Sequence, residues 1–169
     1  MGSSEEIIPV VNEQDEIIGY KKRADITTDD IYRVTWCRIH DTQWNILLAQ
    51  RAFTKKHDPG KRTCAVSGTV PKWETYLVNI LKEIGEEIGI TADENDLLWW
   101  PKVYRKNDRK YFVQRFRLCY DWPKDRLIPL VGEVEQLQRL SPSELKNEYI
   151  SLPKKYTQGM GRSIETFLS

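Results

Sequence analysis

The chain has 169 residues, of which 40% are hydrophobic and 30% are charged, and its 26 Lys and Arg against 25 Asp and Glu leave a formal net charge of +1. This length predicts one domain over residues 1–169, in which residues 1–4 resemble an expression remnant and carry no weight. The balanced charge argues against a broad footprint on a phosphate backbone, so no stable nucleic-acid partner is expected; no apolar run approaches the roughly 20 residues of a membrane-spanning helix.

The first third of the chain predicts antiparallel strands separated by polar turns. Pro9 places the first strand near a sheet edge, because proline has no N–H to donate to a neighbouring strand. Residues 21–30 are polar and form a connector between two predicted hairpins. The four strands are expected over 6–11, 16–20, 33–40 and 45–51, with the first paired to the second and the third to the fourth.

The rest of the chain interleaves helices with strands. A basic loop over 52–63 leads into a short strand over 64–67, and residues 75–89 have the apolar spacing of a helix that ends at Gly89. The stretch Ser-Pro-Ser-Glu over 141–144 has the capping-box pattern of another helix start. The remaining elements are strands over 97–105, 111–120 and 133–140 and a last helix over 156–168. Hairpins among helices predict a mixed sheet and an α/β (α+β) fold.

The helix over 75–89 gathers three carboxylates. With about 100° per residue, Glu86 lies roughly 60° to one side of Glu83, and Glu87 roughly 40° to the other, at axial offsets of ~4.5 and ~6 Å. Three anions this close repel one another at neutral pH. Because only oxygen ligands are offered, a bound cation is expected to be Mg²⁺ or Mn²⁺ rather than zinc.

A solvated acidic face is the ordinary explanation for glutamates on a helix. Two features favour a metal-binding site instead. Lys82 is the only basic residue near the carboxylates on this helix. Gly85 sits inside the helix, where glycine costs ~1 kcal/mol relative to alanine; a closely approaching chain segment or ligand would explain it.

Residues Gly68 to Ile90 resemble the Nudix box. Gly68, five residues, Glu74, seven residues and then KEIGEEIGI match the family pattern at every position except Lys82, where the family has arginine. Chance agreement anywhere in the chain is below roughly one in a million. Outside the box, VNEQDEIIGYKKR, LLAQR and GEVEQLQRLSPSEL resemble the branch that holds isopentenyl-diphosphate isomerases and their hydrolase relatives, so the resemblance covers most of the chain.

The resemblance implies a Nudix-like α/β/α sandwich with a central mixed sheet and a Nudix loop–helix–loop. It also implies a diphosphohydrolase (pyrophosphatase) that uses water and Mg²⁺ or Mn²⁺ to cleave a nucleoside diphosphate linked to another moiety. The positions carried over are the metal ligands Gly68 (through its carbonyl), Glu83, Glu86 and Glu87; the catalytic candidates Glu86, Glu83 and Glu133, with Glu135 as an alternative to Glu133; and the supporting residues Glu74 and Lys82. Because an ammonium cannot make the two-pronged contact of a guanidinium, Lys82 could loosen the metal geometry and lower turnover.

Residues before and inside the box are candidates for substrate binding. Diphosphate hydrolysis needs positive charge near the phosphates, and Arg51, Lys55 and Lys56 precede the box closely enough to supply it. Trp73 lies in the loop between Gly68 and Glu74, where it could stack on a base. His57 is expected to be a loop residue rather than a catalytic base.

The isomerase alternative needs a reactive cysteine. Ser67 occupies the position of the catalytic cysteine of that branch, and Cys64, three residues earlier, is expected to point to the opposite strand face. The isomerases also have a degraded box and use histidine ligands, so hydrolysis is favoured about five to one. The odd number and wide spacing of Cys37, Cys64 and Cys119 predict neither structural disulfides nor a zinc site.

A third alternative is a catalytically weak Nudix domain that senses or binds nucleotides. Such domains typically lose carboxylates, whereas all three are retained here, which favours an enzyme. We expect a small-molecule diphosphate or nucleotide substrate. No signal peptide is visible and the cysteines fit a reducing compartment, which predicts a cytoplasmic location. The family also allows a homodimer.

Overall fold

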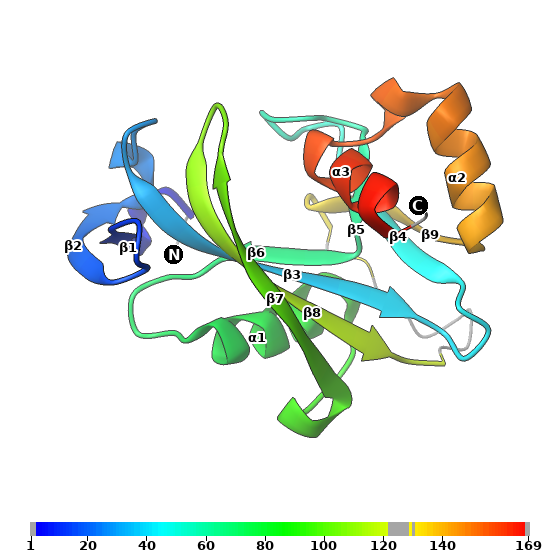
Figure 1. Ribbon diagram of the computed structural model, residues 1–169, viewed down its shortest axis with the longest axis horizontal. Helices are drawn as coiled ribbons and strands as arrows, with labels where there is room; N and C mark the ends of the chain where they lie inside the picture. Colours follow the sequence, from blue (N-terminus) through cyan, green and yellow to red (C-terminus); the bar gives the residue numbers. More distant parts are fainter. Residues whose placement is uncertain (1–2, 122–128, 130, 168–169) are drawn as a thin grey trace.

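A nine-stranded mixed sheet organises the computed structural model, which describes residues 3–121, 129 and 131–167 (Figure 1). The strands are β1 (Ile7–Val11), β2 (Ile17–Lys22), β3 (Ile31–His40), β4 (Ile46–Arg51), β5 (Arg62–Cys64), β6 (Val66–Thr69), β7 (Leu97–Lys106), β8 (Lys110–Cys119) and β9 (Val134–Leu140). The helices are α1 (Tyr76–Ile88), α2 (Pro142–Ser151) and α3 (Gln158–Phe167), with short 3₁₀ turns at Ser3–Glu5, Arg23–Asp25, Glu94–Asp96 and Pro153–Lys155. The predicted elements are confirmed, apart from the differences below.

Strand β3 is the centre of the sheet. It runs parallel to β8 along its whole length and antiparallel to β6, so the sheet is mixed, as predicted. The predicted β3–β4 hairpin is wrong in its pairing, since the two strands meet only at His40 and Ile46. Beyond the turn they diverge, and β4 pairs instead with β5 and β9 to build the second half of the sheet.

The first hairpin forms as predicted, but its outer strand is β2. Strand β1 pairs with β2 along its length and with β3 only through Val11 and Ile31. Pro9 therefore lies in a strand that is paired on one side only, apart from the single contact between Val11 and β3. A strand that is nearly an edge tolerates proline because little of its ladder is lost.

Helices cover both faces of the sheet (Figure 1). Helix α1 buries Ile80, Ile84 and Ile88 in one apolar core together with Cys37 and Phe116. Helices α2 and α3 cover β4 and β5 from the other face; this core includes Ile46, Leu48, Leu145, Met160 and Ile164. Successive β4 residues alternate between the two cores, as the two-residue period of a strand requires. The layers form the α/β/α sandwich expected from the resemblance.

Helix α1 begins and ends at the predicted residues. The Thr75 hydroxyl accepts a hydrogen bond from the Val78 N–H (3.2 Å), and Gly89 ends the helix with a left-handed φ of 71°. Of the two explanations offered for Gly85, the described residues rule out a closely approaching chain segment, whereas a ligand stays a prediction. A Cβ built there would be 3.7 Å from its nearest neighbour, the Ile90 carbonyl oxygen, which is ordinary contact.

The predicted strand over 64–67 is divided in two. Ala65 separates β5 from β6, and both Ala65 and Val66 pack in the α1-side core. Cys64 and Ser67 consequently line the same small cavity, so the expectation that they point to opposite faces is wrong. The strand period breaks at Ala65, which a count along the sequence cannot reveal. In the described part of the chain, no helix is both long and apolar enough to span a membrane.

Candidate active site at the edge of strand β6

Two of the three glutamates on α1, Glu83 and Glu87, meet the sheet at the edge of β6. Within the described residues this strand pairs only with β3, which leaves its other edge open beside α1. The Ser67 N–H donates a hydrogen bond to Glu87 Oε2 (3.0 Å). A Cβ built on Gly68 would lie 2.2 Å from Glu83 Oε1, so the carboxylate lies directly against the backbone at that residue. Two of the three carboxylates are thus held against one strand edge.

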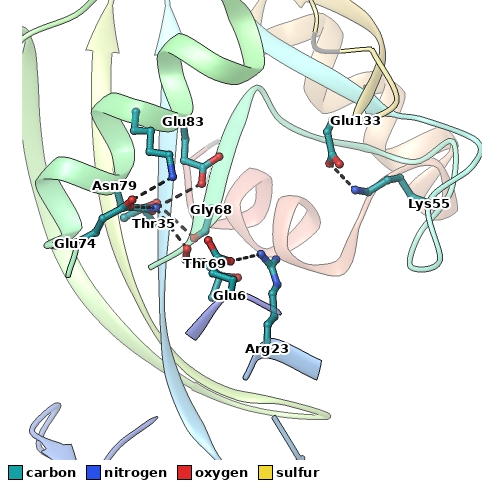
Figure 2. A network of polar contacts seen from close by, with 11 residues as sticks. Glu6, Arg23, Thr35, Lys55, Gly68, Thr69, Glu74, Asn79, Glu83 and Glu133 are labelled. Atoms are coloured by element: carbon teal, nitrogen blue, oxygen red, sulfur yellow. Dashed lines mark hydrogen bonds and ion pairs between the residues drawn. The ribbon is translucent and has the colours of Figure 1, made fainter. Parts of the chain in front are cut away.

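A buried asparagine organises the surroundings of Glu83 (Figure 2). The amide Nδ2 of Asn79 donates to Glu74 Oε2 (2.9 Å) and, more weakly, to Glu83 Oε1 and the Thr69 carbonyl (both 3.4 Å). Its Oδ1 accepts a hydrogen bond from the Thr35 hydroxyl. Asn79 was not predicted from the sequence; the available signal was its position one turn before Glu83 on the same side of the helix.

Glu74 and Lys82 form an ion pair beside this network. Lys82 Nζ lies 3.1 Å from Glu74 Oε1, and this hydrogen bond raises the pKa of the lysine. Because Glu74 also accepts from Asn79, the pair connects the loop before α1 to the middle of the helix. Both residues therefore lie beside the Glu83 carboxylate, and the supporting roles implied for them stay predictions.

Burial and mutual repulsion act on the helix carboxylates. The pKa of Glu83 is raised to about 7, mainly by burial and next by the negative charge of Glu86. The pKa of Glu87 is raised to about 8, mainly by burial and next by the negative charge of Glu83. Glu86 is exposed, and the described residues include no group of three acidic, histidine or cysteine side chains already arranged around one point. Glu83 and Glu87 form the inner pair, and Glu86 flanks them on the solvent side.

Glu133 lies in the wall of a small cavity beside α1, which is called the cleft from here on. This residue borders the same small cavity as Glu87, Ser67 and Arg51, and it forms an ion pair with Lys55 (Figure 2). Glu87 senses both charges, because Glu133 raises its pKa and Arg51 lowers it. Glu135 is exposed and lies outside this cavity wall, so the structure distinguishes the two late carboxylates by position.

The other candidate substrate residues, Lys56 and Trp73, do not line this cavity. Lys56 is exposed. Trp73 is 88% exposed, with a left-handed φ of 79°, and its ring contacts Lys72 Nζ (4.3 Å to the centroid). His57 is a loop residue, as expected: its carbonyl accepts from Arg51 Nε (3.0 Å), and its ring Nε2 lies 3.1 Å from Arg109 Nη2.

The two buried cysteines, Cys37 and Cys64, are poorly suited to proton transfer. Cys64 is buried next to the carboxylates, and burial followed by the charge of Glu87 raises its pKa to about 12. Burial likewise raises the pKa of Cys37. A thiol with such a pKa stays protonated and inert at neutral pH. Although Cys64 lies nearer the cleft than expected, its environment argues against isomerase chemistry.

Comparisons with family models, curated proteins and solved structures agree on one protein family. The NUDIX domain model matches residues 31–167. An uncharacterised Nudix hydrolase of Yersinia pestis is 31% identical over 88 residues, which are 52% of this chain and 48% of the relative; the chain thus spans about half the length of such curated relatives. An isopentenyl-diphosphate Delta-isomerase of Corynebacterium diphtheriae is 24% identical over 95% of this chain and 92% of the relative.

Solved structures show the same fold. A Deinococcus radiodurans protein superposes with a TM-score of 0.78 at 21% identity, covering 95% of this chain and 98% of that one. A MutT protein from Methanosarcina mazei superposes with a TM-score of 0.63 at 18% identity, covering 82% and 92%. At these identities the likeness is one of architecture, and the chemistry must come from the site itself.

Proposed function

This chain belongs to the Nudix family, and from that premise we propose that it hydrolyses a diphosphate linkage in a nucleotide or nucleoside-diphosphate derivative, with water as the nucleophile and Mg²⁺ or Mn²⁺ as cofactor. The observation that carries the proposal is the pair of desolvated carboxylates, Glu83 and Glu87, held against the open edge of β6. Burying two acids side by side is unfavourable unless a cation offsets their charge.

The donor set fits a hard divalent cation. Glu83, Glu87 and the flanking Glu86 offer carboxylate oxygens. Gly68, whose α-carbon lies against the Glu83 carboxylate, offers a carbonyl that accepts only a long hydrogen bond from the Thr35 hydroxyl (3.4 Å). We propose these four residues as the ligands, because oxygen-only donors suit Mg²⁺ and Mn²⁺. When bound, such an ion neutralises charge on phosphate oxygens and lowers the pKa of water.

Other residues of the chain would bind the phosphates and move the proton. Arg51 lines the same small cavity as Glu87, and Lys55 pairs with Glu133 of that cavity, so both place positive charge near these carboxylates. Lys55 also holds Glu133, whose carboxylate can accept a proton once a phosphate competes for the lysine. Glu86 is the second candidate base, since it is exposed to water on the helix. Glu74, Asn79 and Lys82 position Glu83 without contacting substrate.

A substrate panel tests the proposal. We expect phosphate or pyrophosphate release from a nucleoside di- or triphosphate or a nucleotide sugar, dependent on Mg²⁺ or Mn²⁺ and abolished by chelation. Glu87→Gln is expected to remove the activity, whereas the exposed Glu135→Gln serves as the matched control and is expected to retain it. Binding without turnover across the whole panel would instead support a sensor, and isomerisation of isopentenyl diphosphate would contradict hydrolysis.

A further inference from the structure

The sheet face opposite α1 carries three neighbouring arginines. Cys37 and Phe116 pack in the core under α1, so the residues next to them along β3 and β8 point to the other face. These are Arg38 on β3 and Arg115 and Arg117 on β8, and the parallel register places Arg38 directly beside Arg117. Arg115 lies two residues before Arg117, about 6.6 Å along the strand. The register therefore gathers three positive charges on one face of the sheet.

Two tryptophan rings lie among these arginines. The Cζ atoms of Arg38, Arg115 and Arg117 lie 5.6, 5.7 and 5.9 Å from the ring centroid of Trp100, which is on β7. Arg117 Cζ also lies 5.5 Å from the ring centroid of Trp44, in the turn between β3 and β4. We call these five residues, Arg38, Arg115, Arg117, Trp44 and Trp100, the arginine–tryptophan patch.

The patch is open to solvent. Helices α2 and α3 lie at the β4, β5 and β9 side of the sheet, away from the outer strand β7 (Figure 1). Trp44 is 49% exposed, and Leu98, which pairs with Arg117 across β7 and β8, is 54% exposed. The three arginines are half-buried. Because arginine stems can pack on a surface while the charged ends stay in water, the patch is accessible to a partner.

The positive charges of Arg115 and Arg117 are not offset by acidic side chains. In the described part of the chain neither residue forms an ion pair with a carboxylate, and Arg115 Nε donates to the Pro101 carbonyl instead (3.0 Å). Burial and next the charge of Arg117 lower the pKa of Arg38; burial and next the charge of Arg105 lower the pKa of Arg115. Like charges gathered in a partly desolvated place repel one another. The patch therefore favours a partner that brings several negative charges.

We propose that the arginine–tryptophan patch binds single-stranded nucleic acid. Guanidiniums make paired hydrogen bonds to phosphate oxygens, and aromatic rings on a cationic surface stack on unpaired bases of any identity. In a duplex the bases stack on one another and offer the rings no free face, whereas an acidic peptide would leave the rings without a partner. An unpaired strand uses both the arginines and the tryptophans.

The patch is independent of the proposed hydrolysis, because it lies on the face opposite α1, the helix that carries Glu83 and Glu87. The balanced net charge of +1 argued against a stable nucleic-acid partner, but a count of charges does not show which cations share a face. Three arginines contact only a short stretch of backbone. We therefore expect moderate, salt-sensitive binding, with a Kd on the order of 10⁻⁵ M.

Fluorescence anisotropy with a labelled oligonucleotide of about 12 nucleotides tests the proposal. The full chain is titrated in EDTA, so that no metal-dependent cleavage interferes. We expect log K to fall with log salt concentration with a slope of about −2, since each neutralised phosphate of a single strand contributes about −0.7. The double variant Arg115→Gln, Arg117→Gln is expected to weaken binding at least about tenfold and to reduce this slope by about 1.4.

The matched control is Arg139→Gln. Arg139 is already paired with Asp41, and it lies opposite Leu47 of the α1-side core, hence on the other face of the sheet. This variant is expected to bind the oligonucleotide within about twofold of wild type. Circular dichroism of each variant verifies that it folds.

Trp44→Leu separates stacking from charge. Removing this exposed ring is expected to weaken single-strand binding about tenfold while the salt slope stays the same. A duplex of the same length is expected to bind about tenfold more weakly than the single strand.

Four outcomes would overturn the proposal. These are no binding at about 50 mM salt, an unchanged affinity and salt slope in the double arginine variant, a duplex that binds as tightly as the single strand, and displacement of the oligonucleotide by polyglutamate at equal charge. The last outcome would assign the patch to an acidic protein partner instead.

Discussion

The Glu83 carboxylate lies against the α-carbon of Gly68, so closely that a methyl group on this glycine would lie 2.2 Å from a carboxylate oxygen. The box glycine and Glu83, the first box glutamate of helix α1, are therefore one steric unit. We expect Gly68→Ala to displace Glu83 and to lower kcat/KM at least about 30-fold, a loss of about 2 kcal/mol of transition-state stabilisation. The matched control is Gly19→Ala, since a Cβ there meets nothing within 4 Å; equal activities of the two variants would contradict the steric account.

Asn79 is expected to matter for both stability and turnover. Asn79→Ala removes the donor to Glu74 and the acceptor for Thr35, so buried partners lose hydrogen bonds. Leaving such groups unpaired should lower the free energy of unfolding by about 2 kcal/mol, which urea denaturation measures. The exposed Asn95→Ala should change it by less than about 0.5 kcal/mol. An unchanged midpoint in Asn79→Ala would show that water replaces the amide without loss.

The stability of the metal-free protein should fall as pH rises. The pKa of Glu83 is raised to about 7 and that of Glu87 to about 8, so between about pH 4.5 and 8 the folded state binds more protons than the unfolded state. Under that condition the free energy of unfolding decreases with pH. We expect thermal midpoints in EDTA to drop from pH 5 to pH 8, and Glu87→Gln to reduce the slope.

Acid unfolding is expected in a separate, lower pH range. Hydrogen bonds and ion pairs hold the pKa of Asp15 and of Asp30 below the usual value, despite opposing burial. Their stabilisation is therefore lost only as pH falls below about 4.

Saturating Mg²⁺ should flatten the decline of the thermal midpoint between pH 5 and pH 8, because a bound cation favours the ionised forms of Glu83 and Glu87. A midpoint in EDTA that stays constant or rises between pH 5 and 8 would contradict the assignment.

The general base can be identified by comparing two glutamates. We expect Glu86→Gln to lower turnover at least ~100-fold, in line with removal of a principal metal or base group. Glu133→Gln should lower kcat by about 10²–10⁴-fold if this residue accepts the proton, and the pH–rate profile of kcat should then lose its acidic limb. If Glu86→Gln is as active as wild type, Glu86 has no catalytic role; if Glu133→Gln alone retains the acidic limb, Glu133 is not the base.

The sequence was sufficient for the motif and for the helices and most of the strands, although not for the division of the strand over 64–67. Local rules decide where α1 starts and stops, since the Thr75 cap and Gly89 act within one turn. The alternation along β3 and the capping box at Ser141 are equally local. The box spacing likewise identified Gly68 and the glutamates, because these residues are linked through a single loop and helix.

Tertiary structure alone decided which distant residues lie side by side. Pairing of β4 with β9 rather than with β3 brings Glu133 to Glu87, and the parallel β3–β8 ladder brings Arg38 to Arg117. The break at Ala65 turned Cys64 to the side of Ser67. Strand partners depend on competition among edges across the whole chain, so periodicity within a segment cannot determine them.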